Sequence, residues 1–430
     1  MQYVWQHRLW LPTDMNTVDG ERVEVLDPGL PNVNAGPDFF NAKIRIGSRL
    51  WAGNVEIHVK ASDWHRHGHD GDPAYHSVIL HVVERDDARI QRPDGSEVPQ
   101  LVMPCAADFS KVYHEMVDNP ASELPCAEHI GRMEKIQLTD WLTALAFERL
   151  YAKADRVQEL VERSGGDWKE AVYVVLARAL GFGVNSDAFE RLALATPLRN
   201  LLRHCGSSET IEGTLFGQAG FLDSVESDDV ETASYVARMK GEYEFTGHKY
   251  GLQKPAHLGW RMARMRPHNF AYRRLAALAQ TVSDGFGIGY SILHVSNLEE
   301  ARALFYIRLR GYWSRRFSFG APSARSDTAL SRASADTLVI NVVAPVLVAY
   351  ATAYGDERRR ETATDILQSL APEDNAITRL FTTAGVECPD ALASQALVQL
   401  RKCYCQPRKC LYCRIGHRYL ASKAIRRNFS

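Results

Sequence analysis

Apolar and polar residues alternate with a period of two in the first hundred residues, and this pattern predicts strands. Phe39–Ile46 and Trp51–Val59 alternate on either side of a Gly47–Ser48 turn. Val78–Val83 is a continuous apolar run, which is typical of a buried strand. The shorter predicted elements are a helix at Gln2–Leu9 and strands at Arg22–Leu26 and Pro99–Met103. The expected order is α-β-β-β, a loop or short helix, and then β.

Helical periodicity replaces the strand pattern after Gln137, with apolar residues three and four positions apart. One acidic segment, Asp223–Glu244, is expected to be solvated. The predicted helices are Leu138–Ala152, Arg156–Arg163, Trp168–Leu180, Ser186–Leu194, Phe270–Val282, Asn297–Gly311, Thr337–Tyr354, Glu357–Leu370 and Ala391–Lys402.

These patterns predict an α+β protein with three parts. Residues 1–125 form an α-β-β-β-(α)-β domain, residues 126–400 a helical domain, and residues 401–430 a basic tail with a four-cysteine knuckle. The 430 residues are 45% apolar and 24% charged, as in an ordinary soluble globular protein.

No membrane segment or secretory signal is expected. The N-terminus has no basic region followed by an apolar one. The longest apolar run, Leu338–Ala353, contains Asn341 and Pro345 and is shorter than the about 20 residues that span a bilayer. We interpret it as a buried core helix and expect a cytoplasmic protein.

The candidate catalytic residues are an Asp at the head of one predicted strand and three polar residues on the next. Asp38 precedes the first strand, and Glu56, His58 and Lys60 share one face of the second, because side chains at i, i+2 and i+4 point the same way. Carboxylates on neighbouring strands can hold Mg²⁺ or Mn²⁺ and leave positions open for water and phosphate. The other interpretation is a turn followed by an amphipathic, half-buried strand.

The order of elements and these residues resemble the core of the PD-(D/E)XK nucleases. Pro37–Asp38 match the PD and Glu56 the second acid, so the resemblance implies that Asp38 and Glu56 bind a divalent metal. The lysine of that family is replaced by His58, and Lys60 lies one alternation further along. His58 or Lys60 would then handle the attacking water.

Four further polar residues are supporting groups or alternative ligands. Asp63, His67 and His69 follow the second strand, and His81 lies in the buried run, where it is expected to face His58 or Glu56. Imidazoles suit Zn²⁺, so a zinc site competes with the magnesium site. A solvated loop for His67 and His69 and a hydrogen-bonded core position for His81 are the alternatives.

The spacing Cys403-x-Cys405-x₄-Cys410-x₂-Cys413 places four thiols within eleven residues. Four thiolates fill the shell of one Zn²⁺, which makes a structural site, and an iron–sulfur cluster is the alternative. The last forty residues contain no Asp or Glu, so Arg408 and Lys409 beside the knuckle are candidate phosphate contacts, or part of a solvated basic end.

A second basic concentration lies in the predicted helical domain next to aromatic residues, a combination that suits nucleic acid. An ordinary helix boundary explains the same residues. The candidates are Arg261, Arg264, Arg266, Arg273 and Arg274.

Over nearly its whole length the chain resembles a bacterial family catalogued only as a domain of unknown function. The resemblance rests on GPDFFNAKIRI, GNVEIHVKASDWHRHGHDGD, YHSVILHVV, RPHNF, SQALVQL and YCQPRKCLYCRIG. It implies a cytoplasmic bacterial protein and no established activity. The leading hypothesis is a metal-dependent nuclease acting on DNA or RNA; the alternatives are a zinc-dependent hydrolase of a small molecule and a non-catalytic nucleic-acid-binding protein.

Overall fold

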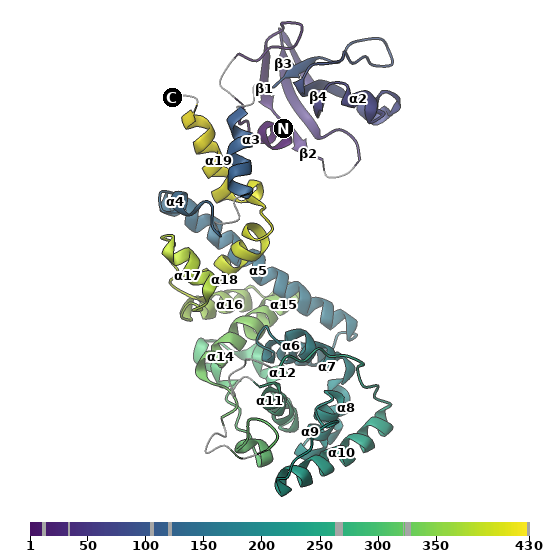
Figure 1. The fold of residues 1–430 in the computed structure, drawn as a ribbon, viewed down its shortest axis with the longest axis vertical. Coiled ribbons are helices and arrows are strands. Elements are labelled where there is room, and N and C mark those ends of the chain that lie inside the picture. Colours follow the sequence, from purple (N-terminus) through teal and green to yellow (C-terminus); the bar gives the residue numbers. More distant parts are fainter. Residues whose placement is uncertain are drawn as a thin grey trace. The chain divides into compact units, whose positions relative to one another are not determined.

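The computed structural model describes residues 1–10, 14–32, 35–103, 107–118, 123–262, 270–320, 322 and 328–427. The chain forms two compact units. We call Met1–Glu134 with Cys403–Ser430 the sheet unit, and Lys135–Lys402 the helical unit (Figure 1). The α+β class is confirmed, but the cysteine segment belongs to the sheet unit and is not a separate third part.

A mixed sheet forms the first part of the sheet unit. Its strand order is β1-β3-β4-β5-β6, with the short β2 paired to β3. The pairs β1/β3 and β3/β4 are antiparallel, whereas β4/β5 and β5/β6 are parallel. The bounds are β1 Val23–Asp27, β2 Leu30–Pro31, β3 Phe39–Ile46, β4 Arg49–Lys60, β5 Val78–Arg85 and β6 Gln100–Val102.

The parallel pairing of β4 and β5 needs a crossover, which the segment after β4 supplies. This segment contains the short helix α2 (Asp63–Arg66) and two 3₁₀ turns, η1 (His69–Gly71) and η2 (Pro73–Tyr75). Trp64, Tyr75 and Val78 pack there in one apolar cluster. The crossover is therefore held on the sheet by its own core and not only by its ends.

Gly53 lies where β4 passes close to the start of β5. A Cβ atom at this position would lie 2.4 Å from Ile79 Cγ2 and 2.8 Å from the Ser77 carbonyl oxygen. Only glycine fits there without a shift of the neighbouring strand. Residues Val55 to His58, which begin two positions later, are all buried, so this stretch of β4 is covered on both faces.

The sheet unit also contains short and terminal helices. Its cysteine segment includes the π-helical turn η8 (Leu400–Cys405), which begins in the helical unit, and the 3₁₀ turn η9. The remaining bounds are α1 Gln2–Gln6, α3 Ala107–Val117, α4 Ala127–Ile130, η9 Cys410–Tyr412 and α19 Arg414–Arg427.

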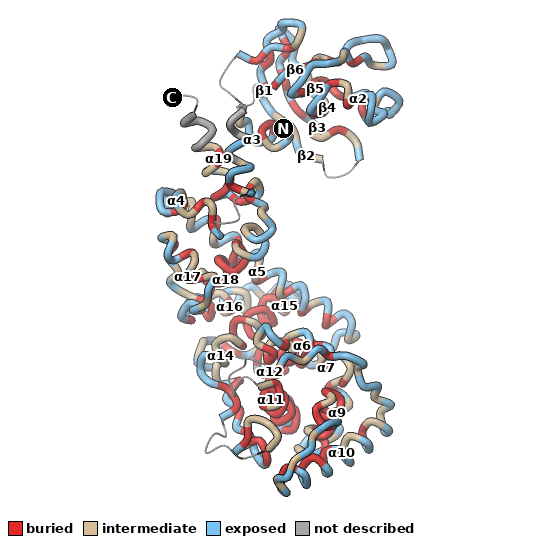
Figure 2. The backbone as a smooth tube through the Cα atoms, viewed as in Figure 1, coloured by how far each residue is buried: buried red, intermediate tan, exposed pale blue. Residues whose placement is uncertain are grey.

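The helical unit is built around α5 (Lys135–Arg163), which packs against α15 (Ala344–Tyr354) and α18 (Ala391–Gln399). Figure 2 shows buried residues along α15 and α18. The other helices are α6 Trp168–Leu180, α7 Ser186–Ala195, α8 Leu198–Leu201, α9 Ser208–Gln218, α10 Val230–Tyr250, α11 Ala271–Ser283, α12 Ile288–Ser291, α13 Leu298–Ala303, α14 Arg332–Leu338, α16 Glu357–Ser369 and α17 Ala376–Thr383. Short 3₁₀ or π turns are η3 Leu202–His204, η5 Ile292–His294, η6 Gly311–Ser314 and η7 Val339–Val343.

The helical unit differs from the prediction at three places. The two helices expected over residues 138–163 are one continuous helix, α5, whose buried positions continue through Ala154 and Val157. Most residues of the acidic segment Asp223–Glu244 are exposed, as expected, but its larger part is helical, and α10 buries Tyr235, Val236 and Met239. The helix expected at 297–311 is shortened to α13.

One helical stretch among the described residues, Arg332–Tyr354, is long and apolar enough to cross a membrane. Within its most apolar run of 18 residues, 67% is buried in the fold. Its residues Val339 to Ala349 are nearly all buried against other helices. This agrees with the predicted core helix and with a soluble protein.

Lys153 on α5 provides a test of packing in the helical unit. Its ammonium group donates hydrogen bonds to Asn341 Oδ1 at 2.8 Å and Gln395 Oε1 at 2.7 Å. Burial, helped by the positive charge of Arg149, lowers the pKa of Lys153 from 10.5 to about 7. Between these pH values the unfolded chain holds a proton that the native chain has released, so the free energy of unfolding rises with pH.

We therefore expect Lys153→Met to remove a rise of up to about 1.4 kcal/mol per pH unit between pH 7 and 10. Urea unfolding at several pH values measures this slope. Lys169→Met, at an exposed position on α6, is the matched control and should keep the wild-type slope. Equal slopes in wild type and Lys153→Met would contradict the assignment.

Candidate metal centre

Strand β4 carries Glu56, His58 and Lys60 on one face, as predicted. The Glu56 and His58 side chains are each only 6% exposed, whereas Lys60 is exposed. The backbone N–H of Lys60 donates to Asp63 Oδ2, and its side chain lies outside the buried group. The strand therefore delivers an acid and an imidazole to an enclosed position and leaves the lysine at the edge.

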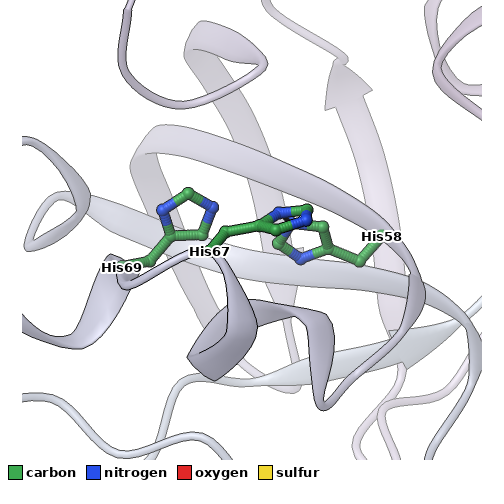
Figure 3. Close-up of side chains that lie close together, drawn as sticks. All are labelled: His58, His67 and His69. Carbon is green, nitrogen blue, oxygen red and sulfur yellow. Dashed lines mark hydrogen bonds between the residues drawn. The ribbon is translucent and has the colours of Figure 1, made fainter.

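Three histidines converge beside this strand. The ligating nitrogens of His58, His67 and His69 all lie within 4.8 Å of one another (Figure 3). His58 Nε2 is 3.1 Å from His67 Nδ1. Between the two loop histidines, Gly68 has φ of 76°, a left-handed conformation that glycine adopts without steric cost, and this turn brings both rings back toward β4.

Glu56 lies next to the same nitrogens. Its Oε1 atom is 3.4 Å from His58 Nε2 and 3.4 Å from His69 Nε2. The Nε2 atom of His69 is buried and has no hydrogen-bond partner among the described residues. An unsatisfied imidazole nitrogen beside a carboxylate and two more imidazoles fits a cation ligand set.

His81 on β5 supports His58 from behind. Residues Glu56 and His81 are register partners in the parallel pair, and His81 Nε2 lies 2.9 Å from His58 Nδ1. A proton on His58 Nδ1 shared with His81 leaves the lone pair of His58 Nε2 for a metal, which is how a second partner usually orients a ligating histidine. His81 is fully buried, so both the predicted cross-strand contact and the predicted core position are confirmed.

Aromatic rings and Asp63 fix the surrounding loop. Tyr75 stacks on His69 with ring centroids 3.7 Å apart, and Trp64 contacts His69 and His81 edge-on. Asp63 accepts hydrogen bonds from the Lys60 backbone and forms an ion pair with Arg66 at 3.0 Å. Asp63 thus supports the loop and is not part of the converging histidine group.

Burial sets the electrostatics of the centre. It lowers the pKa of His58 to about 4, with the neighbouring His69 and His67 adding to the shift, and it lowers the pKa of His81 to about 3. Burial and the charge of Asp38 raise the pKa of Glu56 to about 8. Neutral imidazole is the form that binds metals, and a bound cation would favour the ionised form of Glu56.

Asp38 lies next to Glu56 but is held by protein donors. Its backbone N–H donates to Glu56 Oε2 at 3.0 Å, its Oδ2 accepts from Ile57 N–H at 3.0 Å, and its Oδ1 accepts from Gln2 Nε2 at 2.6 Å. The predicted acidic pair is therefore adjacent. That Asp38 and Glu56 share one ion stays a prediction.

A cavity of about 1000 Å³ adjoins Asp38 and His58 within the sheet unit. Residues of α1, including Gln2, and of α19 also line it. Two of the α19 residues, Arg414 and Arg418, are exposed arginines. The cavity is large enough for a small ligand or one or two nucleotides and has a basic lining on α19.

The predicted cysteine quartet is placed differently from the expectation. Cys405, Cys410 and Cys413 lie together around one small cavity, but Cys403 is exposed and does not line it. The described cysteines form no disulfide with one another. Sequence spacing alone favoured Cys403 because it is nearest along the chain.

The predicted nucleic-acid role of Arg273 and Arg274 is wrong. Both side chains are buried, at 0% and 2% exposure. Arg273 donates to the carbonyl oxygens of Trp313, Arg316 and Thr328. Arg274 donates to that of Ala329, so the guanidinium groups bind backbone inside the fold and offer no charge to a polymer.

The other basic candidates have different outcomes. Arg261, Lys409 and the half-buried Arg408 stay candidates, the first two at exposed positions. Arg264 and Arg266 lie outside the described residues.

The family model described as protein of unknown function, DUF2851, matches residues 1–376. The chain belongs to this family. The expected resemblance to a family of unknown function is thus confirmed. For this DUF2851 protein, a search of curated proteins and a search of solved structures each found no match.

The geometry of this DUF2851 protein predicts that His67 is needed to retain a metal. His67→Ala removes one of three converging nitrogens, so bound Zn²⁺ or Mn²⁺ after dialysis should fall at least about tenfold. Loss of a residue that only hydrogen-bonds to a metal ligand already lowers metal affinity by about this factor. His76→Ala, at an exposed position in the same loop, is the matched control.

Isothermal titration of chelator-treated protein measures the affinity. Because cysteines elsewhere also bind zinc, Mn²⁺ is titrated first, since it has little preference for thiolates. Equal affinity of His67→Ala and His76→Ala would exclude the histidine centre.

Proposed function

We propose that the sheet unit is a metal-dependent hydrolase that cleaves phosphodiester bonds in nucleic acid. The observation that carries this proposal is the convergence of His58, His67 and His69 beside Glu56, with His67 exposed to solvent. The order α1-β1-β2-β3-β4-α2-β5 matches the expected α-β-β-β-α-β order once the two-residue strand β2 is set aside, and with Asp38 before β3 and Glu56 on β4 it supports a phosphodiester substrate.

The donor set favours a transition ion. Three imidazole ligands with a carboxylate beside them suit Zn²⁺ or Mn²⁺, whereas Mg²⁺ prefers oxygen ligands and keeps several waters. Zinc–nitrogen bonds of about 2.0–2.1 Å require ligand nitrogens roughly 3.3 Å apart, so separations within 4.8 Å need only a small closure. Three protein ligands would leave a fourth position open, as in catalytic zinc sites.

Each residue then has a distinct role. A bound ion would polarise a phosphoryl oxygen and acidify a water. Glu56, 3.4 Å from two of the imidazole nitrogens, is placed to accept the proton of that water. His81 orients His58, and Asp38 orients Glu56 through its backbone N–H.

Glu56→Gln tests the proton-accepting role, because it keeps the size of the side chain and removes its basicity. We expect kcat to fall at least about 10²-fold with little change in bound metal. The assay uses single-stranded, duplex and branched DNA and RNA with Zn²⁺, Mn²⁺ or Mg²⁺. His76→Ala is the control, and full activity of Glu56→Gln would reject Glu56 as the base.

The recessed position of Glu56 and His58 favours one alternative, a hydrolase of small phosphate esters. Bis(p-nitrophenyl) phosphate in the same assay distinguishes the two. Turnover of this compound with no cleavage of any polymer would support the alternative. No turnover of either with metal bound would reject a phosphodiesterase.

The basic lining of the cavity on α19 makes a separate prediction about polymer binding. Arg418 is exposed and lines the cavity that also contains Asp38 and His58. Arg418→Ala should weaken nucleic-acid binding and reduce the slope of log affinity against log salt by about one, if it contacts one phosphate.

Arg49→Ala is the matched control, because Arg49 is also exposed but lies at the start of β4 outside the cavity lining. Fluorescence anisotropy over a salt series measures both slopes. An unchanged slope for Arg418→Ala would remove α19 from the polymer path.

We also propose a cytoplasmic location, in keeping with the thiol content.

A further inference from the structure

Four cysteines from two distant parts of the sequence line one cavity in the sheet unit. Cys405, Cys410 and Cys413 come from the C-terminal segment, and Cys126 from the residue before α4. The cavity is small, about 20 Å³, and three of the four cysteines are buried. Cys403, two residues from Cys405, is exposed and outside the lining.

The thiols influence one another directly. Burial raises the pKa of the Cys126 thiol well above its ordinary value, and the proximity of Cys405, Cys413 and Cys410 raises it further. Burial and Cys413 also raise the pKa of Cys410. The four thiols therefore lie close enough for their charges to interact.

The backbone around these cysteines is closely packed. At Gly416, in the first turn of α19, a Cβ atom would lie 2.3 Å from the Cys410 carbonyl oxygen, so only glycine allows the helix to approach η9 this closely. The Lys409 N–H donates to the Tyr404 carbonyl at 2.8 Å, and the His417 N–H to the Cys413 carbonyl at 2.8 Å. These bonds hold the three C-terminal cysteines in two consecutive turns.

Two observations favour an iron–sulfur cluster over a single zinc ion. Cys405-x₄-Cys410-x₂-Cys413 has the spacing of the three clustered ligands of plant-type [2Fe–2S] proteins, and the distant fourth cysteine, Cys126, precedes them here instead of following them. Among the described residues, no three cysteine sulfurs lie within 4.8 Å of one another. Zn–S bonds of about 2.3 Å would require sulfurs roughly 3.8 Å apart, whereas a cluster with several iron atoms separates its thiolates further.

We propose that Cys126, Cys405, Cys410 and Cys413 together hold an iron–sulfur cluster, and that Cys403 is not a ligand. The helical unit, Lys135–Lys402, lies in the sequence between Cys126 and Cys405. The cluster therefore ties the two separate pieces of the sheet unit together across an insertion. Closing so long a loop restricts the unfolded chain strongly, so the cluster stabilises the sheet unit.

The test is metal analysis of the full chain purified without oxygen. We expect about two iron and two acid-labile sulfide atoms per chain and visible charge-transfer absorption. Cys126→Ser should lose at least about fivefold of the labile sulfide, and Cys403→Ser should retain it. Cys388→Ser, a part-buried cysteine of the helical unit, controls for the loss of a thiol elsewhere. Labile sulfide is the readout because iron at the histidine centre would contain none.

A second measurement does not depend on the folding of a variant. Wild-type protein is alkylated before and after removal of metal, and each cysteine is quantified by mass spectrometry. Cys126, Cys405, Cys410 and Cys413 should become reactive only after removal, whereas Cys403 should react throughout.

Three results would overturn the proposal. One zinc per chain with no labile sulfide would reject the cluster. Loss of sulfide in Cys403→Ser but not in Cys126→Ser would reject the ligand set. Reactivity of Cys126 in metal-replete protein would do the same. None of these results bears on the histidine centre, whose metal is measured separately.

Discussion

The parallel pairing of β4 with β5 is the constraint on which the candidate metal centre depends. It sets Glu56 opposite His81 and brings the His81 ring to 2.9 Å from His58. A parallel pair cannot be joined by a tight turn, so the chain must leave the sheet and return. The crossover that this requires carries His67 and His69, and its length and its Gly68 turn bring them back over β4.

The same pairing explains why the buried histidines of the centre, His58 and His81, have lowered pKa values. Residues Val55 to His58 are covered on both faces, so the His58 imidazole and the Glu56 carboxyl lose water. Without an ion, burial favours the neutral imidazole of His58 and the protonated carboxyl of Glu56, because the charged forms lose hydration. A divalent cation would reverse the preference of the carboxyl and use the lone pairs that the fold leaves without partners. Burial of His58 and Glu56 thus favours cation binding at this position.

The C-terminal segment raises a different question, which is how the sheet unit is held together when a long insertion divides its sequence. The two pieces of the sheet unit are separated in sequence by the whole helical unit. Their contacts include the Tyr3 hydroxyl, 2.5 Å from His417 Nδ1, and the four thiols around one cavity. The proposed cluster would add a cross-link between the two pieces, and a cross-link between distant residues stabilises the fold mainly by restricting the unfolded chain.

The sequence by itself determined the strands around Asp38 and Glu56, the shared face of Glu56 and His58, and the candidate ligands His67, His69 and His81. Local periodicity controls these features, because alternation along a strand decides which side chains point the same way. It also indicated the buried helix around Leu338 to Ala353.

Only the tertiary structure decided which residues meet across long separations. Cys126 lies far from the other cysteines in sequence, so spacing favoured the adjacent Cys403. Arg273 and Arg274 have the composition of a phosphate site, yet carbonyl oxygens from residues 313–329 enclose them. Neither outcome has a local signal, because burial and partner choice depend on contacts between residues whose proximity the fold alone creates.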